Sequence, residues 1–409
     1  RVLLAKDLLN KVFDNKFNEI SSTQDLFLRS PGEKIPFLIV NEIIGDKLID
    51  IRYEKIWKDA PPPFNNHENA YRVISGDFVT TDEGTGIVHT APTFGADDAL
   101  AASKANPPVP PLLTKDENGE LVPLVNLQGK FINNLKIIGG KYVKNEYYDE
   151  DEIPEKSVDV EICIHLKKIN RAFKVEKYIH SYPNCWRTDK PILYYPLDSW
   201  FIGVSKIRNK LVSLNKEINW VPKSTGEKRF SNWLSSANDW NLSRSRYWGI
   251  PLPIWRTIDN TETKVIGSVK ELKNEILKSI KNKHMKYDPL DKFQVDNMSK
   301  ENYDTIDLHK DTVDDIILSS EKGKPMYREN DLIDVWFDSG AMPYAQIHYP
   351  FENKDFIDKK KVFPADYIAE GVDQTRGWFY TLHVISTIVF NSVSYKNVIS
   401  NGLVLDKNG

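Results

Sequence analysis

The sequence predicts an α/β protein in which a domain built on a parallel sheet with crossover helices follows a β-rich domain. Two observations indicate the parallel sheet. Helical and strand-like runs alternate after residue 190. An apolar run at 367–369 also stops at Gly371 and leads at once into a helical pattern. A strand that ends in glycine and continues into a helix is the arrangement in which open α/β sheets bind nucleotides.

The elements expected after residue 190 follow from the spacing of apolar residues. Helices are predicted at 227–237, with Phe230, Trp233 and Leu234 on one face, and at 269–281. Strands are predicted at three apolar runs, namely 250–255, 366–369 and 397–405. The segment 281–301 is charged and weakly apolar, and we expect it to be a surface excursion within a connecting segment, 256–330.

Before residue 190 the apolar runs are short, rich in β-branched and aromatic residues and broken by turn signals. Strand-like runs occur at 36–40 and 136–140. The proline-rich stretch 107–111 is expected to end a short helix that starts near Asp97. Gly84 and Gly86 allow a tight turn before a predicted strand at 87–88. The predicted domains are therefore 1–190 and 191–409.

The composition limits the classes of protein. A chain of 409 residues allows two or three domains, and 40% hydrophobic with 28% charged residues is typical of a soluble globular protein. A net charge of −3 neither favours nor excludes RNA as a partner, because RNA binding needs only a local basic face. No apolar run approaches a membrane span, so a cytoplasmic protein is expected. Cys163 and Cys185 are too few for a disulfide framework or a cysteine-only zinc site.

Four segments resemble isoleucyl-tRNA synthetases and occur in the same order as in that family. Segment 370–379, Glu-Gly-Val-Asp-Gln-Thr-Arg-Gly-Trp-Phe, is similar to the family's Gly-x-Asp-Gln-x-Arg-Gly-Trp-Phe. Segments 334–340, Asp-Val-Trp-Phe-Asp-Ser-Gly, and 243–251, Ser-Arg-Ser-Arg-Tyr-Trp-Gly-Ile-Pro, look like two further motifs. Segment 84–92, Gly-Thr-Gly-Ile-Val-His-Thr-Ala-Pro, resembles the core of the family's editing domain.

The resemblance implies that 191–409 is the second half of a Rossmann-like catalytic domain, and 1–190 most of an inserted editing domain. The parent enzyme would activate isoleucine with ATP and transfer it to isoleucine tRNA, with Mg²⁺ expected to neutralise phosphate charge. The residues implied to contact the aminoacyl-adenylate are polar groups and a glycine at the strand-to-helix turn: Glu370, Gly371, Asp373 and Gln374. A carboxylate can bind the substrate's ammonium group, and free backbone amides suit polar adenylate groups.

The family also makes Trp336 and Trp378 walls of the isoleucine pocket, although tryptophans are more often simply core residues. Two indoles form a flat, stiff slot that excludes aromatic side chains by size. Such a slot rejects valine by only about 1–3 kcal/mol, a magnitude known from this enzyme family itself. A second, hydrolytic site is therefore required.

In that editing site, the resemblance implies that Asp98 holds the α-ammonium of misattached valine and that His89 lines the pocket. His89 could instead be a core histidine, and Asp97 or Asp98 could be a helix cap. Phe94 stands where many bacterial members have histidine. Some members carry Cys-x-x-Cys where 185–188 reads Cys-Trp-Arg-Thr, so no metal or zinc is predicted here.

Three family segments are missing: His-x-Gly-His, the threonine-rich editing stretch, and a Lys-Met-Ser-Lys loop expected just past Gly409. Segment 297–300, Asn-Met-Ser-Lys, imitates that loop but lies at the wrong place in the order. We therefore expect an internal fragment of a monomeric enzyme, inactive in aminoacylation by itself. Two alternatives are a carbohydrate-active protein, suggested by the many Trp and Tyr residues, and a non-catalytic RNA-binding module, suggested by the basic stretch 167–174.

Overall fold

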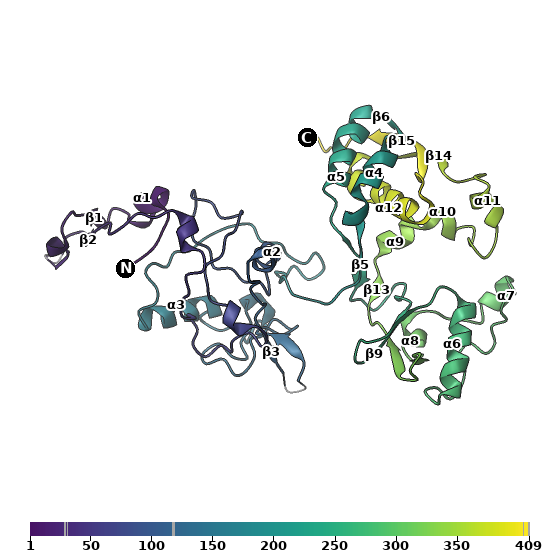
Figure 1. Cartoon of the computed structure of the whole chain (residues 1–409), viewed down its shortest axis with the longest axis horizontal. Helices are drawn as coiled ribbons and strands as arrows, with labels where there is room; N and C mark the ends of the chain where they lie inside the picture. The colour runs from purple at the N-terminus through teal and green to yellow at the C-terminus, as the bar shows by residue number, and fades with distance from the viewer. Residues whose placement is uncertain (28–29, 31, 117–118, 404, 408–409) are drawn as a thin grey trace. The chain divides into compact units, whose positions relative to one another are not determined.

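The computed structural model describes residues 1–27, 30, 32–116, 119–403 and 405–407. The chain divides into two compact units, Arg1–Leu197 and Asp198–Gly409, which are coloured purple to teal and teal to yellow (Figure 1). This division does not test whether the units are an editing and a catalytic domain, and those assignments stay predictions. No helix in the described part of the chain is both long and apolar enough to cross a membrane.

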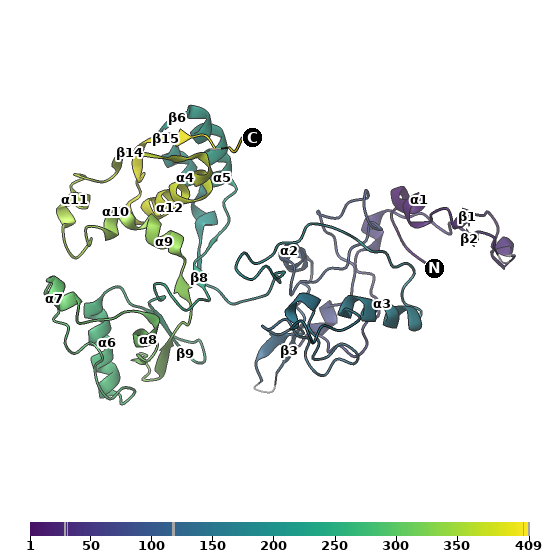
Figure 2. The same ribbon diagram turned by 180° about the vertical axis from the view of Figure 1, so that it is seen from behind.

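A parallel three-stranded sheet forms the centre of the Asp198–Gly409 unit. Its order is β14 (Ala365–Gly371), β15 (Tyr395–Asn401) and β6 (Asn219–Val221), and Ala369 is in register with Ile399. After β14 the chain enters a 3-10 helix, η8 (Val372–Arg376), and then α12 (Trp378–Phe390), which crosses back to β15. Helix α12 lies beside the sheet in both views (Figures 1 and 2). The predicted strand–glycine–helix order and the parallel sheet are confirmed.

Helices pack against this sheet around one buried apolar cluster, which includes Leu211, Phe230, Phe379 and Val398. The helices are α4 (Arg208–Asn215), η7 (Thr225–Phe230), α5 (Ser231–Ser235), α9 (Val335–Gly340), α10 (Met342–Ala345) and α11 (Lys354–Asp358). The helix predicted at 227–237 is therefore present, but its first part, η7, is a π-helix. Phe230 and Leu234 are buried, as predicted, and Trp233, predicted on the same face, is half-buried.

The segment 254–328 has a sheet and core of its own. An antiparallel sheet runs in the order β10 (Thr263–Val265), β9 (Ile254–Thr257), β12 (Pro325–Arg328) and β11 (Leu318–Ser319). Helix α6 (Val269–Lys281) has the predicted bounds, and Ser268 caps it by accepting a hydrogen bond from the Glu271 amide. The excursion predicted at 281–301 is not purely a surface segment, because Leu290 and Phe293 are buried.

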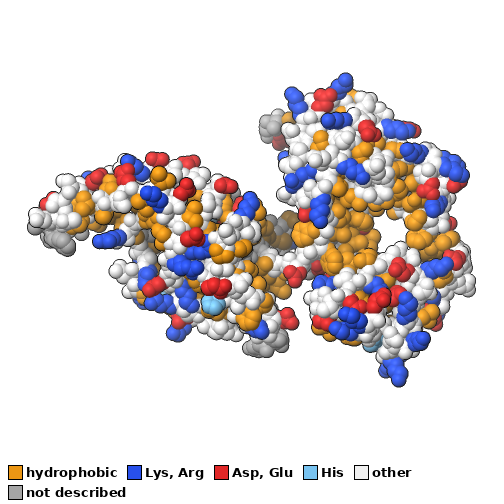
Figure 3. Space-filling model, in the orientation of Figure 1, with side chains coloured by type: hydrophobic (Ala, Val, Ile, Leu, Met, Phe, Trp, Pro, Cys, Tyr) orange, Lys and Arg blue, Asp and Glu red, His pale blue; other side chains and the backbone are white. Residues whose placement is uncertain are grey.

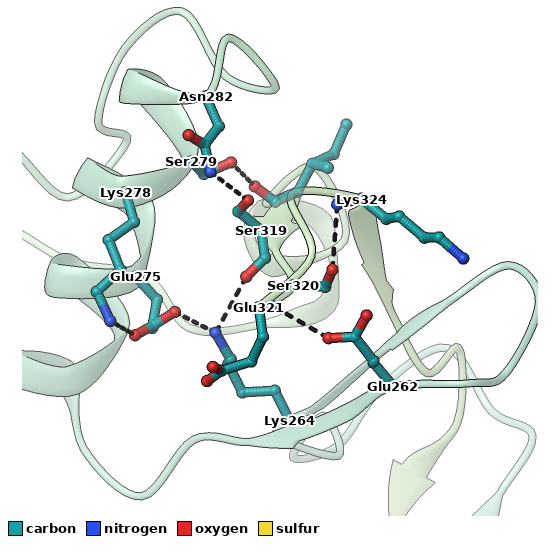
Figure 4. A network of polar contacts seen from close by, with 11 residues as sticks. Glu262, Lys264, Glu275, Lys278, Ser279, Asn282, Ser319, Ser320, Glu321 and Lys324 are labelled. Atoms are coloured by element: carbon teal, nitrogen blue, oxygen red, sulfur yellow. Dashed lines mark hydrogen bonds and ion pairs between the residues drawn. The ribbon is translucent and has the colours of Figure 1, made fainter.

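A polar network joins α6 to this antiparallel sheet (Figure 4). The buried carboxylate of Glu275 accepts hydrogen bonds from Lys264 and Lys278. Burial opposes ionisation of Glu275, but the two ammonium groups outweigh it and lower its pKa. Lys264 also donates to the Ser319 carbonyl at 3.0 Å, and Asn282 donates to the Ser319 hydroxyl at 2.6 Å. The network fixes α6 along the sheet.

Short elements connect the sheets of this unit. Strand β5 (Phe201–Ile202) pairs with β7 (Trp240–Asn241), and β8 (Ser243–Arg244) pairs with β13 (Leu332–Ile333), both antiparallel. The remaining short helices are η6 (Val204–Ile207), α7 (Lys300–Tyr303) and α8 (Lys310–Val313). Ser299, in the segment that imitates Lys-Met-Ser-Lys, caps α7.

The Arg1–Leu197 unit has short elements joined by long loops. Its strands form two pairs: β1 (Phe17–Glu19) with β2 (Ile35–Phe37), parallel, and β3 (Leu113–Lys115) with β4 (Leu121–Pro123), antiparallel. Its helical segments are η1 (Lys6–Leu8), α1 (Leu9–Val12), η2 (Thr23–Phe27), η3 (Gly45–Leu48), η4 (His67–Asn69), α2 (Ala96–Lys104), η5 (Asn145–Tyr147) and α3 (Val158–Lys168). The strong β character predicted for 1–190 is not seen in the described residues.

Two predicted strands in this unit are wrong. Residues 87 and 88 form no strand, and both side chains are exposed. The run 136–140 is a turn, because Ile137 has a φ of 75° and the Gly139 amide donates to the Leu135 carbonyl at 2.8 Å. The helix predicted near Asp97 is confirmed as α2, and it ends before Pro107 as expected.

Candidate functional site

The turn at the carboxyl end of β14 gathers most of the residues predicted to bind the adenylate. Gly371 ends the strand, and the Asp373 carboxylate folds back over it into space that a side chain at 371 would fill. Asp373 accepts a hydrogen bond from the Gln374 amide group at 3.1 Å. The Gln374 side-chain oxygen in turn accepts from the Trp378 backbone amide at 2.8 Å, at the first residue of α12. These hydrogen bonds hold the turn in one conformation before any ligand arrives.

This arrangement corrects one expectation about the turn. The sequence suggested that backbone amides at the start of the helix are free for adenylate groups. The Trp378 amide instead donates to Gln374, and the Gly377 amide donates to the Gln374 carbonyl at 3.0 Å. Gln374 therefore caps α12 from inside the turn, and its side-chain oxygen is already used by the Trp378 amide.

Trp378 is the first residue of α12, and Trp336, on α9, lies beside it at Gly377. A side chain at Gly377 would meet the Gln374 oxygen at 2.6 Å and the Trp336 ring at 3.4 Å, so Trp336 passes directly over this glycine. The Trp378 indole donates to the Ser339 carbonyl of α9 at 2.9 Å. Trp336 is 42% exposed, while Trp378 is half-buried. The structure thus brings together two indoles, one of which presents a face to solvent.

Helix α9 approaches α12 closely through Gly340, its last residue. A side chain there would meet the Thr381 backbone carbon at 3.1 Å and Ile385 at 2.9 Å. Only glycine permits this spacing, and the spacing brings Trp336 on α9 to the first turn of α12. Figure 3 shows hydrophobic side chains gathered over the region of α9 and α10, with charged side chains scattered over the rest of that face.

The most important positioning residue missed by sequence reasoning is Asp334. Its buried carboxylate caps α9 by accepting from the Trp336 amide at 3.3 Å. It also accepts from the Trp240 indole at 3.0 Å and from Arg244 at 2.7 Å. Asp334 therefore ties segment 243–251 to segment 334–340. A signal was present, because an aspartate directly before a helix is a typical cap.

Two further carboxylates border the turn. Asp338, on α9, is half-buried, and burial together with the nearby charge of Asp334 raises its pKa. Glu370, predicted to contact the adenylate, is exposed near the end of β14 and in register with Ser400. Its carboxylate has no hydrogen bond to the other described residues, which leaves it accessible to a ligand.

The predicted editing residues lie in the Arg1–Leu197 unit on a loop that leads into α2. Gly84 and Gly86 have φ values of 64° and 73° and form the predicted turn. His89 is exposed and therefore not a core histidine. Asp98 accepts a hydrogen bond from the Ala91 amide at 2.9 Å, which ties the loop to the helix. The cap residue of α2 is Gly95, without a side-chain cap, so Asp97 is not the helix cap.

The rest of this loop is held by one hydrogen bond and one aromatic contact to other parts of the same unit. The buried Thr93 hydroxyl accepts from the Leu112 amide at 2.8 Å. Phe94 packs edge-on against Tyr195, with ring centroids 6.0 Å apart. Phe94 thus serves as a packing residue. His89 lies on this loop, and Asp98 lies in the first turn of α2. No direct contact joins their side chains among the described residues.

No group of three or more His, Cys, Asp or Glu side chains within the described ranges is arranged to hold a metal ion. Cys185 lies in a tight turn in which the Thr188 amide donates to its carbonyl at 3.2 Å. Hydrogen bonds from the Thr188 side chain and from the Arg187 and Thr188 amides lower the pKa of the Cys185 thiol.

Two cations of the basic stretch 167–174 pair with neighbouring acids in the described part of the chain. Arg171 pairs with Glu54 at 3.2 Å, and Lys174 pairs with Glu176 at 2.8 Å and Asp14 at 3.6 Å. Cations that are already paired offer less to a phosphate backbone.

Comparison with known proteins gives a consistent result. Residues 64–409 match the family model described as tRNA synthetases class I (I, L, M and V). The whole chain is 55% identical to an isoleucine–tRNA ligase of Bacteroides fragilis and 53% identical to one of Cytophaga hutchinsonii, covering 36% and 35% of their lengths. An isoleucine–tRNA ligase of Clostridium acetobutylicum is 41% identical over 98% of this chain and 34% of its own length. The chain thus spans about a third of these curated relatives.

A solved structure, from a ternary complex of Agrobacterium radiobacter LeuRS, matches 42% of this chain and 20% of its own at 17% identity with a TM-score of 0.26, a similarity too low to carry an argument. Nothing in the comparisons favours the carbohydrate-active or non-catalytic RNA-binding interpretation.

Proposed function

The chain belongs to the class I tRNA synthetases (I, L, M and V), and we propose that it is the part of an isoleucine–tRNA ligase that carries half of the activation site and most of an editing site. The observation that carries the proposal is the turn after β14, where Asp373, Gln374 and two indoles meet at the start of α12. The curated relatives named above support isoleucine as the amino acid.

At the activation site, Asp373 and the accessible Glu370 are the groups suited to bind the ammonium of an amino acid or its adenylate. Asp373 is already oriented by Gln374, so little conformational freedom is lost when it binds a cation. Trp336 and Trp378 would form the slot for a branched aliphatic side chain. ATP would be a substrate. The described residues present no acidic cluster for Mg²⁺, so no step on this chain is assigned to that ion.

Kinetics of the full-length enzyme test the activation site. We expect Trp378→Ala to raise the isoleucine KM about 30-fold, which corresponds to about 2 kcal/mol for a lost aromatic contact. ATP–pyrophosphate exchange with ATP saturating is the measurement. Trp57→Ala, which removes a partly buried indole from the other unit, is the matched control and should leave the KM unchanged. If both variants behave alike, Trp378 is only a core residue.

At the editing site, we propose that Asp98 binds the ammonium of valine esterified to tRNA and that exposed His89 borders the pocket. The hydrogen bond from Ala91 leaves Asp98 a second carboxylate oxygen for this ion pair. The same carboxylate would then hold both the loop and the substrate, so its two roles need separate variants.

Accumulation of valyl-tRNA by the full-length enzyme separates the two roles of Asp98. Asp98→Asn keeps an oxygen for the Ala91 amide but removes the charge, so we expect valyl-tRNA to accumulate while isoleucine activation stays normal. Asp97→Asn removes the neighbouring exposed charge and should edit normally. If Asp98→Asn clears valyl-tRNA at the parental rate, Asp98 only holds the loop.

We also propose isoleucine tRNA as the macromolecular partner, a cytoplasmic location and a monomeric enzyme. By itself the chain should show no isoleucine-dependent ATP–pyrophosphate exchange, because it lacks the family's His-x-Gly-His motif. Exchange clearly above background from the isolated chain would contradict this.

A further inference from the structure

Segment 178–187, hereafter the aromatic segment, carries a row of aromatic rings that no proposed role has used. Tyr178 and Trp186 are 74% and 78% exposed. Tyr178 and His180 are stacked with centroids 5.3 Å apart, and His180 meets Tyr182 edge-on at 6.0 Å. These three residues alternate along the chain, which places their rings on one side of an extended backbone.

Hydrogen bonds hold the C-terminal part of the aromatic segment, from Tyr182 onward. The Tyr182 hydroxyl donates to the Ile192 carbonyl at 2.7 Å. The Cys185 amide donates to the Lys190 carbonyl at 2.8 Å, and residues 184 and 191 form an antiparallel bridge. Trp186 therefore projects from a closed turn. The rings are exposed, and the chain that carries them is held at Tyr182 and around Trp186.

Cations lie directly over two of the rings. The Lys144 ammonium is 4.9 Å from the Tyr182 ring centre, and the Arg187 guanidinium is 4.5 Å from that of Trp186. Neither cation pairs with a carboxylate in the described part of the chain, in contrast to Arg171 and Lys174. Covering the rings with an apolar protein surface would bury unpaired charges, which is unfavourable. A polyanion with aromatic faces avoids that penalty.

We propose that the aromatic segment binds a single-stranded stretch of RNA, with bases stacked on Tyr178, Tyr182 and Trp186 and phosphates paired with Lys144 and Arg187. Aromatic rings beside cations are the combination that binds single strands, because every base has a face to stack and every nucleotide a charge. The inference rests on the proposed function, in which the substrate is a tRNA, and it adds where an unpaired part of that tRNA binds.

Fluorescence anisotropy of the full-length enzyme with a labelled single-stranded RNA hexanucleotide tests the inference. We expect Tyr178→Ala and Trp186→Ala each to weaken binding about 10-fold. Tyr178→Phe keeps the ring and should stay within about twofold of the parent, because stacking needs no hydroxyl. Tyr287→Ala removes a tyrosine of similar exposure, 72%, from the other unit and should not change the affinity.

Two further measurements distinguish base stacking from simple attraction between charges. Arg187→Ala should weaken binding and reduce its dependence on salt, because one phosphate contact is lost. Duplex RNA should compete poorly, since its bases are already stacked. Two results would overturn the proposal. One is that duplex RNA competes for binding as well as single-stranded RNA does, and the other is that Tyr178→Phe lowers the RNA affinity as much as Tyr178→Ala. Unchanged RNA affinity with lower thermal stability in Tyr178→Ala would also overturn it, showing that another part of the protein covers the rings.

The outcome is independent of the catalytic assignment. Isoleucine-dependent ATP–pyrophosphate exchange requires no RNA, and we expect the aromatic-segment variants to retain it. Absence of exchange in the parent enzyme would refute the proposed function, whereas intact exchange with unaltered RNA binding in Tyr178→Ala and Trp186→Ala would refute only the stacking site.

Discussion

The turn after β14 and the loop before α2 share an order of features, glycine, polar residues and then a helix, but they differ in support. The first turn continues a strand of a parallel sheet and borders a buried core. The second follows no strand, and it is tied to α2 by the hydrogen bond from the Ala91 amide to Asp98 and by the backbone hydrogen bond from Gly95 to the Ala91 carbonyl. A pattern of residue types can therefore mark a site without specifying how rigid it is. The rigidity of the first turn comes from the sheet and the buried core that it borders.

The largest effect is expected from Asp334→Ala in the rigid region. The change leaves Arg244 unpaired and removes the acceptor of the Trp240 indole, so the free energy of unfolding should fall by about 4 kcal/mol. Hydrogen exchange of the β15 amides measures this fall in the free energy of unfolding. The control is Asp373→Ala, which removes an exposed carboxylate of the same region and should change the free energy of unfolding little. Equal effects would mean that the buried network is not what supports the turn.

The buried His383 should make the same region sensitive to acid. Its Nε2 contacts the Leu211 carbonyl at 3.0 Å, and burial lowers its pKa from 6.5 to about 4. Between these values the unfolded chain binds a proton that the folded chain does not. Stability from this group is therefore complete above pH 6.5 and falls by about 3 kcal/mol as the pH drops to 4.

Urea denaturation of the protein at pH 7 and pH 5 checks this expectation. His383→Gln removes the titration, so the difference in stability between the two pH values should shrink relative to the parent. An unchanged difference would show that other groups govern the acid sensitivity.

A smaller effect is expected from Gln374→Ala. Loss of the oxygen that accepts from the Trp378 amide should lower stability by about 1 kcal/mol, as for other helix caps. Gln374→Glu keeps an acceptor and, when compared in an Asp373→Asn background that avoids two adjacent carboxylates, should stay closer to the parent. Thermal unfolding of the three proteins gives the comparison, and a Glu variant as unstable as the Ala variant would contradict the capping role.

The smallest global effect is expected in the loop region. Asp98→Ala should lower overall stability by about 0.5 kcal/mol, because the hydrogen bond is partly exposed. Its local effect should be visible as faster hydrogen exchange of the Ala91 amide. Asp97→Ala is the matched control and should leave that amide unchanged. If Ala91 exchanges at the same rate in both variants, the loop has another support.

Sequence periodicity predicted several regular elements of the Asp198–Gly409 unit, but the strand predicted at 250–255 begins only at Ile254, in β9, and the one predicted at 397–405 ends at Asn401, in β15, with residue 404 outside the described residues. The bounds of α6 were read correctly because Ser268 caps a regular amphipathic pattern. The turn at Gly371 was read correctly because the strand, glycine and helix are adjacent in the chain. The contacts of Asp334 with Trp240 and Arg244 were not predicted, because they join residues about ninety positions apart and no local pattern encodes them.

Prediction was poorer in the Arg1–Leu197 unit. Ile87 and Val88 favour strands by their branching, but a strand needs a partner, and none of the described residues pairs with them. The run 136–140 also contains two adjacent β-branched residues, yet Ile137 adopts a positive φ and the chain folds back. The β-branched residues of this unit therefore indicate only a local preference for extended backbone, and not that a strand forms. The editing residues were located through the resemblance, and their roles stay predictions.

The absence of a side chain at Gly340 bears on how the amino-acid preference of such an enzyme could be redesigned. A methyl group at this position would act as a wedge between α9 and α12, since the Thr381 backbone is 3.1 Å away. Trp336 is on the opposite end of the same short helix, so the wedge would displace the indole without changing any side chain proposed to line the slot. If the proposed slot binds the amino acid, helix spacing, and not only the side chains proposed to line the slot, is thus a variable for engineering a wider or narrower substrate range.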